Sequence, residues 1–231
     1  MAAVSHPLAD GRAVSFSSDV AALDLSVEPT STARVVHGNF QYEVVVGKPT
    51  LAEIVARHLG FALDEEYRYG SLAVRVGWTL WRDEYTGSRV PMGLASVTGP
   101  QASFYFHRYG GRSADLVALV EALAPAEVAG GVRFDLSRRV RPFDVPTMMK
   151  ELPGLGIATV RPRTSTSAYE ARRGVRQVET RTGTASVHGE GAPNETWVVV
   201  GDTVVATLEP DRALERAVAH DAIVGLAIEL G

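Results

Sequence analysis

The chain has 231 residues, of which 45% are hydrophobic and 22% charged, and this composition excludes wholesale disorder. The absence of cysteine excludes disulfides, thiolate nucleophiles and cysteine-ligated metals. The formal net charge is −4, yet residues 132–181 carry eleven basic and five acidic side chains, whereas both flanking segments are net acidic. Such a basic belt can attract an acidic partner or can be neutralised within the fold.

The first part of the chain predicts two strands and a helix. Residues 12–27 and 33–46 contain alternating, β-branched apolar positions typical of strands, and the turn-rich segment between them predicts a hairpin-like pair. Residues 51–60 predict a helix, because Thr50 and Glu53 have capping-box spacing and Gly60 is a typical C-terminal stop.

An antiparallel meander and a second helix are predicted next. The three strands cover residues 71–82, 89–97 and 102–109 and are separated by Gly-containing turns. Ser113 is a candidate cap for a helix over residues 114–124, whose apolar residues recur on one face before Pro125 ends it.

The second half of the chain mixes short strands with two expected helices. Strands are predicted over residues 132–136, 157–163, 174–182, 184–188, 196–200 and 203–208, the last two joined by a tight turn at Gly201-Asp202. Residues 144–152 predict a short helix opened by Asp144 and Pro146. A final helix is expected over residues 210–220, and residues 221–230 fit its continuation or a last strand.

These elements predict an α+β protein with mainly antiparallel sheet or sheets covered by three or four helices. The change in composition near Gly130 also favours two subdomains. In this interpretation residues 1–130 form a β-rich α+β subdomain with two helices. Residues 131–231 form an α+β subdomain with a basic first half and an acidic C-terminal helix.

No motif for a cofactor or a metal is present. The segment Val44–Thr50 resembles a phosphate loop only superficially, because Tyr42 stands where the first glycine is required and Pro49 separates Lys48 from Thr50. The six histidines have no metal-ligand spacing. We therefore expect no cofactor and no metal. The lack of a signal peptide or a long apolar run predicts a cytoplasmic protein without a membrane segment.

One strand carries a candidate recognition surface. Alternation over residues 103–109 places Tyr105, His107 and Tyr109 on one face and Phe104 and Phe106 on the other. The Tyr-His-Tyr face suits partner recognition, because such rings offer rigid area with a polar tip. A second packed layer is the alternative interpretation.

The arginines of the belt are the other candidate site. They occur in three clusters in polar segments, namely Arg138, Arg139 and Arg141, then Arg161 and Arg163, then Arg172 and Arg173. Arginine forks suit carboxylates and phosphates, so these clusters predict an acidic partner or an anionic small molecule. Nucleic acid is disfavoured by the acidic total charge and by the lack of interleaved stacking aromatics.

No reaction centre is evident in the sequence, and the hypothesis is therefore a non-enzymatic protein-binding or assembly protein, acting on a protein partner or by self-association into a homo-oligomer. Two alternatives stay open. One is an arginine-lined binder of a phosphorylated or polyanionic ligand. The other is an enzyme with His107 or His188 as the base of a site assembled only in the fold.

Overall fold

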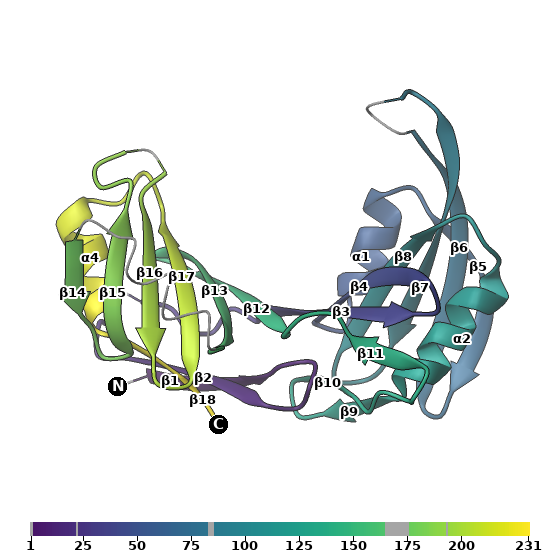
Figure 1. Ribbon diagram of the computed structural model, residues 1–231, viewed down its shortest axis with the longest axis horizontal. Coiled ribbons are helices and arrows are strands. Elements are labelled where there is room, and N and C mark those ends of the chain that lie inside the picture. Colours follow the sequence, from purple (N-terminus) through teal and green to yellow (C-terminus); the bar gives the residue numbers. More distant parts are fainter. Residues whose placement is uncertain (1, 22, 83–85, 165–175, 193) are drawn as a thin grey trace. The chain divides into compact units, whose positions relative to one another are not determined.

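The computed structural model describes all residues except 1, 22, 83–85, 165–175 and 193. The chain divides into two compact units that interleave along the sequence (Figure 1). Unit 1 contains residues 1–6, 12–30 and 146–231, and unit 2 contains residues 7–11 and 31–145. Unit 2 therefore continues past Gly130, where the composition changes.

The predicted α+β class with three or four covering helices is wrong. The structure is 54% strand and 13% helix, and the described residues contain only three short helices, which are α1 (Leu51–His58), α2 (Ser113–Leu123) and α4 (Arg216–Val224). The pairings are antiparallel, as expected. The excess of strand includes residues 147–152, where a helix was predicted, and residues 2–7, 62–69, 125–128 and 140–142, where no strand was predicted.

The main sheet of unit 2 is built from hairpins. Its strands are β3 (Thr30–His37), β4 (Phe40–Gly47), β5 (Ala62–Tyr69), β6 (Leu72–Arg82), β7 (Arg89–Thr98) and β8 (Ser103–Tyr109). They lie in the order β3-β4-β8-β7-β6-β5. The predicted meander is confirmed by β6, β7 and β8, which pair consecutively.

Unit 2 also contains three shorter strands. They are β9 (Pro125–Val128), β10 (Gly131–Phe134) and β11 (Val140–Pro142). β9 pairs with β10, and β11 pairs with β3.

The predicted pairing of residues 12–27 with 33–46 is wrong. The second of these segments is itself the hairpin of β3 and β4, turning at Gly38, whose φ of +59° suits a glycine. Residues from the first segment form β2 (Ala13–Ser18), which pairs with β18 (Leu226–Leu230) at the far end of the chain. A pairing between such distant segments leaves no local signal in the sequence.

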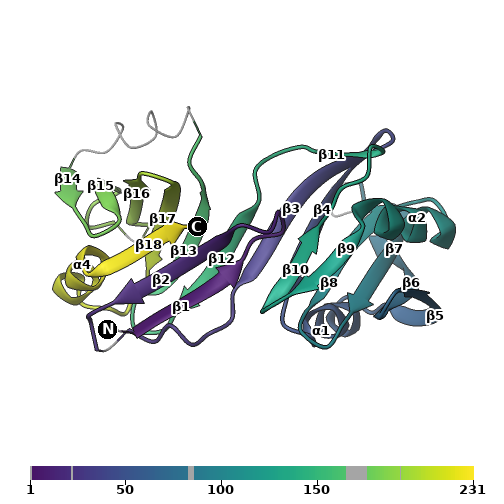
Figure 2. The same cartoon turned by 90° about the horizontal axis from the view of Figure 1, so that it is seen from below.

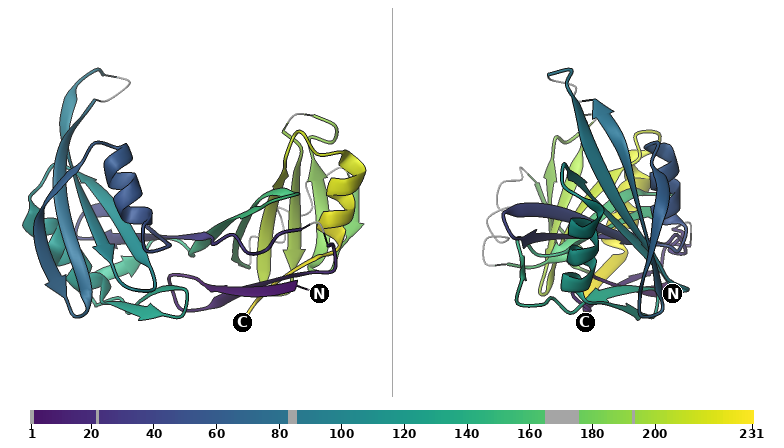
Figure 3. Two further views of the ribbon diagram at one scale, coloured as in Figure 1. Left: turned by 180° about the vertical axis from the view of Figure 1, so that it is seen from behind. Right: turned by 90° about the vertical axis from the view of Figure 1, so that its right-hand side faces the viewer.

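Helices α1 and α2 lie on opposite faces of the unit 2 sheet (Figure 3). The main core joins Phe104 and Phe106 of β8 to Leu116 and Leu119 of α2. The other face, here called the outer face, carries a smaller cluster in which Ala56 of α1 packs with residues of β7. Trp78 packs against the main core and Trp81 against the outer cluster, as their alternation predicts.

Unit 1 also consists mainly of sheet. Its strands are β1 (Ala2–Pro7), β2, β12 (Thr147–Leu152), β13 (Gly156–Pro162), β14 (Arg176–Glu179), β15 (Gly183–His188), β16 (Thr196–Gly201), β17 (Val204–Pro210) and β18. One sheet has the order β14-β15-β16-β17-β13-β12, and β1, β2 and β18 form a separate sheet (Figure 2). The predicted hairpin at Gly201 is confirmed by β16 and β17.

Two predicted helices of unit 1 need correction. Residues 147–152 form β12 because Met148, Lys150 and Leu152 are buried whereas Met149 and Glu151 are exposed, which is the period of a strand. The last helix is α4, which begins at Arg216 instead of Pro210, and β18 follows it. The helix thus continues past His220 to Val224 before the last strand begins, so each of the two alternatives holds for part of residues 221–230.

The close packing of β5 on β6 depends on a glycine. A Cβ atom at Gly77 would lie 2.0 Å from the carbonyl oxygen of Ala62, near the point where the register of β5 shifts. We expect Gly77→Ala to lower the free energy of unfolding by about 2 kcal/mol or more, because backbone atoms must move. Urea-induced unfolding measures this change. Thr79→Ala on the same strand is the control, and equal midpoints for the two variants would contradict the packing argument.

Candidate functional site

The structure divides the Tyr105, His107 and Tyr109 face into a covered and an uncovered part. Tyr105 packs against the cluster beneath α1 and is half-buried, so the alternative of a second packed layer holds for this residue. His107 and Tyr109 are exposed, and their rings meet edge to face with centroids 5.7 Å apart. The uncovered end of β8 therefore presents two rings to solvent.

These rings belong to a hollow of about 470 Å³ in unit 2, which we call the aromatic hollow. Its walls come from β3, β4, β8 and the segment after β11, and consist of Arg34, Phe40, Gln41, Tyr42, Glu43, His107, Arg108, Tyr109 and Phe143. Phe40 is 46% exposed, Tyr109 50% and Phe143 54%. Large apolar side chains that share one hollow and stay this exposed are typical of an interaction site.

The sheet register explains why these residues meet. Glu43 alternates with the buried Tyr42 and Val44 of β4, so its side chain lies on the outer face. Phe143 extends the pairing of β11 with β3, because its backbone N–H donates to the carbonyl oxygen of Arg34 at 2.8 Å. The hollow is thus assembled from segments more than a hundred residues apart.

The cations inside the aromatic hollow are already engaged. Arg34 Nε lies 3.1 Å from a carboxylate oxygen of Glu43. Arg108 lies 3.4 Å from Asp115 and stacks over the Phe40 ring at 4.1 Å. Partial burial lowers the pKa of His107, and the negative charge of Glu43 opposes this shift. The imidazole is therefore neutral near pH 7.

The belt arginines do not form one patch within a unit. Arg138, Arg139 and Arg141 are exposed in unit 2, whereas Arg161 and Arg163 belong to unit 1. The predicted residues Arg172 and Arg173 lie outside the described residues. The belt is continuous in the sequence, but its described arginines are divided between the two units.

Several arginines of the belt contact a carboxylate or a carbonyl oxygen within their own unit. Arg133 pairs with Asp135 through two contacts of 2.9 Å, and Arg181 lies 2.8 Å from Asp19. Arg163 donates to the carbonyl oxygen of Gly201 at 2.9 Å. In contrast, Arg138, Arg139 and Arg141 form no ion pair with any residue whose position is described.

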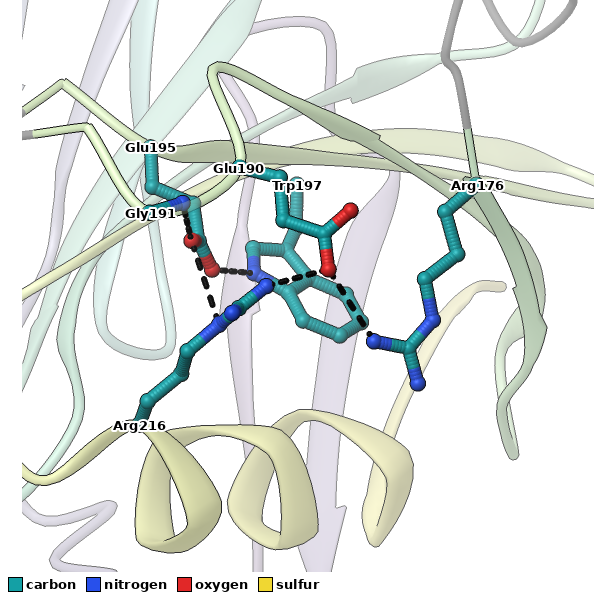
Figure 4. A network of polar contacts seen from close by, with 6 residues as sticks. All are labelled: Arg176, Glu190, Gly191, Glu195, Trp197 and Arg216. Atoms are coloured by element: carbon teal, nitrogen blue, oxygen red, sulfur yellow. Dashed lines mark hydrogen bonds and ion pairs between the residues drawn. The ribbon is translucent and has the colours of Figure 1, made fainter.

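A network of two arginines and two glutamates holds the loop between β15 and β16 (Figure 4). Glu190 in this loop accepts hydrogen bonds from Arg176 of β14 and from Arg216 at the start of α4. Glu195 accepts from the indole N–H of Trp197 at 3.0 Å and lies 3.4 Å from Arg216. Both arginines lower the pKa of Glu190. The network anchors a loop and has no unpaired charge to offer a ligand.

The histidines proposed as catalytic bases lack partners. Within the described part of the chain, no hydrogen bond joins His107 or His188 to a carboxylate or a hydroxyl group. His188 Nε2 is buried without a partner. No group of three potential metal ligands occurs among the described residues either.

Sequence reasoning missed the buried pair of Lys150 and His6 in unit 1. Lys150 is fully buried and its ammonium donates to the carbonyl oxygen of Val27, with His6 Nε2 3.2 Å away and the Phe16 ring centroid 5.5 Å away. Burial lowers the pKa of Lys150 and, together with the lysine's charge, lowers the pKa of His6 to about 4. The alternation of Met148, Lys150 and Leu152 is the signal that could have revealed it.

This pair has a structural role. The bond from the Lys150 ammonium to Val27 fixes the segment that precedes β3. A buried amine of this kind costs desolvation energy unless it is hydrogen-bonded, which explains the two contacts.

No protein family model, no curated protein and no solved structure matches this chain. The described residues include no helix that is long and apolar enough to cross a membrane.

The lowered pKa of His6 makes stability depend on pH. The unfolded chain binds a proton at His6 below about pH 6.5, whereas the folded protein resists protonation until about pH 4. This term is therefore favourable above pH 6.5 and is lost as the pH falls toward 4, by at most about 3 kcal/mol. Urea unfolding across this range should show a smaller loss for His6→Gln than for the unmodified protein. His58→Gln, on the exposed side of α1, is the control, and equal slopes for all three proteins would contradict the assignment.

Proposed function

We propose that this chain is a non-enzymatic binding protein whose partner docks on the aromatic hollow of unit 2. The observation that carries the proposal is the exposure of Phe40, Tyr109 and Phe143 around a single hollow. Aromatic side chains supply much of the binding energy of protein interfaces, because they bury a large area at a low cost in conformational entropy.

The charges around the hollow favour a protein segment over a small anion. Arg34 and Arg108 are held by Glu43 and Asp115, so the hollow offers no unpaired cation to a phosphate group. Arg141 lies on the same face, because it alternates with the buried Val140, and it forms no ion pair within the described residues. A segment with an apolar anchor and a neighbouring carboxylate matches this arrangement.

The alternatives receive less support. Within either unit alone the described belt clusters do not gather into one arginine-lined site, since Arg138, Arg139 and Arg141 belong to unit 2 and Arg161 and Arg163 to unit 1. An enzyme with His107 as a base would need a hydroxyl or carboxylate partner, and none of the described residues provides one. We keep the cytoplasm as the proposed place of the interaction, because a chain without cysteine needs no oxidising compartment to fold.

The proposal predicts the effect of substitutions in the hollow on peptide binding. The purified protein is used to select from a displayed library of random peptides, and a selected peptide is measured by fluorescence anisotropy. We expect peptides with an aromatic or aliphatic anchor next to an acidic residue. Tyr109→Ser and Phe143→Ser should each weaken binding about tenfold or more, because each removes a ring that the partner covers.

Leu80→Ser is the matched control, because Leu80 is 61% exposed in the same unit but does not line the hollow. Its affinity should equal that of the unmodified protein. The proposal fails if no peptide is enriched, or if Leu80→Ser weakens binding as much as the substitutions in the hollow do.

A further inference from the structure

A second exposed apolar surface lies in unit 1, in a groove of about 860 Å³ that we call the acidic groove. Met149 is 52% exposed and Ile157 is 42% exposed, and both line the groove. Val27, whose carbonyl oxygen is held by buried Lys150, forms part of the wall. The groove therefore has an apolar floor and a wall that is fixed from within.

Two carboxylates flank the apolar floor at paired positions of neighbouring strands. In the register of the sheet, Ile157 of β13 lies opposite Glu151 of β12 on one side and opposite Glu209 of β17 on the other. The two glutamates are thus separated by two strand spacings, or about 10 Å between backbones. Both are exposed, so an apolar side chain that covers Ile157 has a carboxylate on each side.

The negative charge of the groove is not neutralised locally. Four acids line it, namely Glu28, Glu151, Glu209 and Asp211, against the single cation of Arg212. None of them forms an ion pair with a described residue. A ligand that fits this groove therefore combines positive charge with an apolar group.

A segment of unit 2 has these properties. Residues 138–143, which we call the basic segment, include the exposed Arg138, Arg139, Arg141 and Phe143. Its three arginines form no ion pair with a described residue, and Phe143 is 54% exposed at the rim of the aromatic hollow. The segment offers several cations beside one ring, with Arg138 and Arg139 in the turn before β11 and Phe143 directly after it.

We propose that the acidic groove of one copy of this chain receives the basic segment of a second copy. The inference rests on the proposed function, since it identifies the partner of the aromatic hollow as another molecule of the same protein. Of the nine large hydrophobic side chains exposed among the described residues, Met149 and Ile157 lie in the acidic groove and Phe143 in the basic segment, while Phe40 and Tyr109 lie in the adjoining aromatic hollow.

The contact joins the acidic groove of one copy to the basic segment of another. When the second copy returns the same contact, two copies form a closed two-fold dimer, and otherwise a free groove and a free basic segment bind further copies. Because exposed charges contribute, we expect association to weaken as salt concentration rises.

A charge exchange tests the contact. Glu151→Arg with Glu209→Arg reverses the groove, and Arg139→Glu with Arg141→Glu reverses the basic segment. All four positions are exposed, so the variants should fold normally, which circular dichroism checks. Sedimentation velocity should show the mass of the unmodified protein rising between about 1 µM and 1 mM, the range expected for a weak interface.

Each double variant alone should associate at least about 30-fold more weakly, because like charges meet. An equimolar mixture should regain association, since each variant then supplies the surface that the other needs. The inference is overturned if the unmodified protein stays monomeric at low salt, if the groove variant associates normally, or if the mixture does not recover. Peptide binding that still depends on Tyr109 in that case would leave the proposed function intact and exclude only the second copy as partner.

Discussion

The structure of unit 2 depends on the fact that its sheet carries apolar clusters on both faces while the helices available to cover them are short. Helix α1 has eight residues and is therefore about 12 Å long, whereas β3 to β8 form a sheet about 24 Å wide. One helix of this size covers Tyr105 and the residues of β7 beside it. His107 and Tyr109, two and four positions further along β8, are left outside. The exposure of these two rings of the aromatic hollow is thus a direct consequence of incomplete coverage of the outer face.

The distribution of charge along the sequence does not indicate which charges stay unpaired in the fold. The basic belt of residues 132–181 is pronounced along the sequence, but the chain enters unit 2 and then unit 1 within that segment. Arg133, Arg163, Arg176 and Arg181 each find a carboxylate or a carbonyl oxygen within their own unit. The part of the belt that stays exposed without an ion pair among the described residues is the short stretch that contains Arg138, Arg139 and Arg141. The useful quantity is therefore the unpaired charge after folding, and not the charge of a stretch of sequence.

Local signals in the sequence predicted local structure well. Helices α1 and α2, the meander of β6 to β8 and the hairpin at Gly201 each depend on nearby residues, and each is confirmed. The pairing of β2 with β18 joins opposite ends of the chain, and no local pattern indicates it. Within the candidate site, alternation along β8 placed His107 and Tyr109 on a common face, whereas Phe40 and Phe143 join them only through tertiary structure.

The failure at β12 has an instructive cause. Asp144 and Pro146 resemble the start of a helix, and the segment ends before a Pro-Gly pair, so both boundary signals favoured a helix over residues 144–152. The alternation of Met148, Lys150 and Leu152 favoured a strand, but the lysine obscured it because lysine is almost never fully buried. Here the ammonium is satisfied by a carbonyl oxygen and an imidazole, which makes burial possible. One polar residue in an apolar position was enough to mislead the pattern.

The same alternation gives β12 its second role. Turning Lys150 inward forces Met149 and Glu151 outward, where they line the groove together with Ile157 and Glu209. An apolar floor beside unpaired carboxylates repels a second groove of the same kind and accepts a basic surface. The exposed arginines beside Phe143 likewise repel one another. Because each surface is self-repelling and the two are mutually attractive, the charge pattern opposes contacts of groove with groove or of segment with segment and favours association between unlike surfaces.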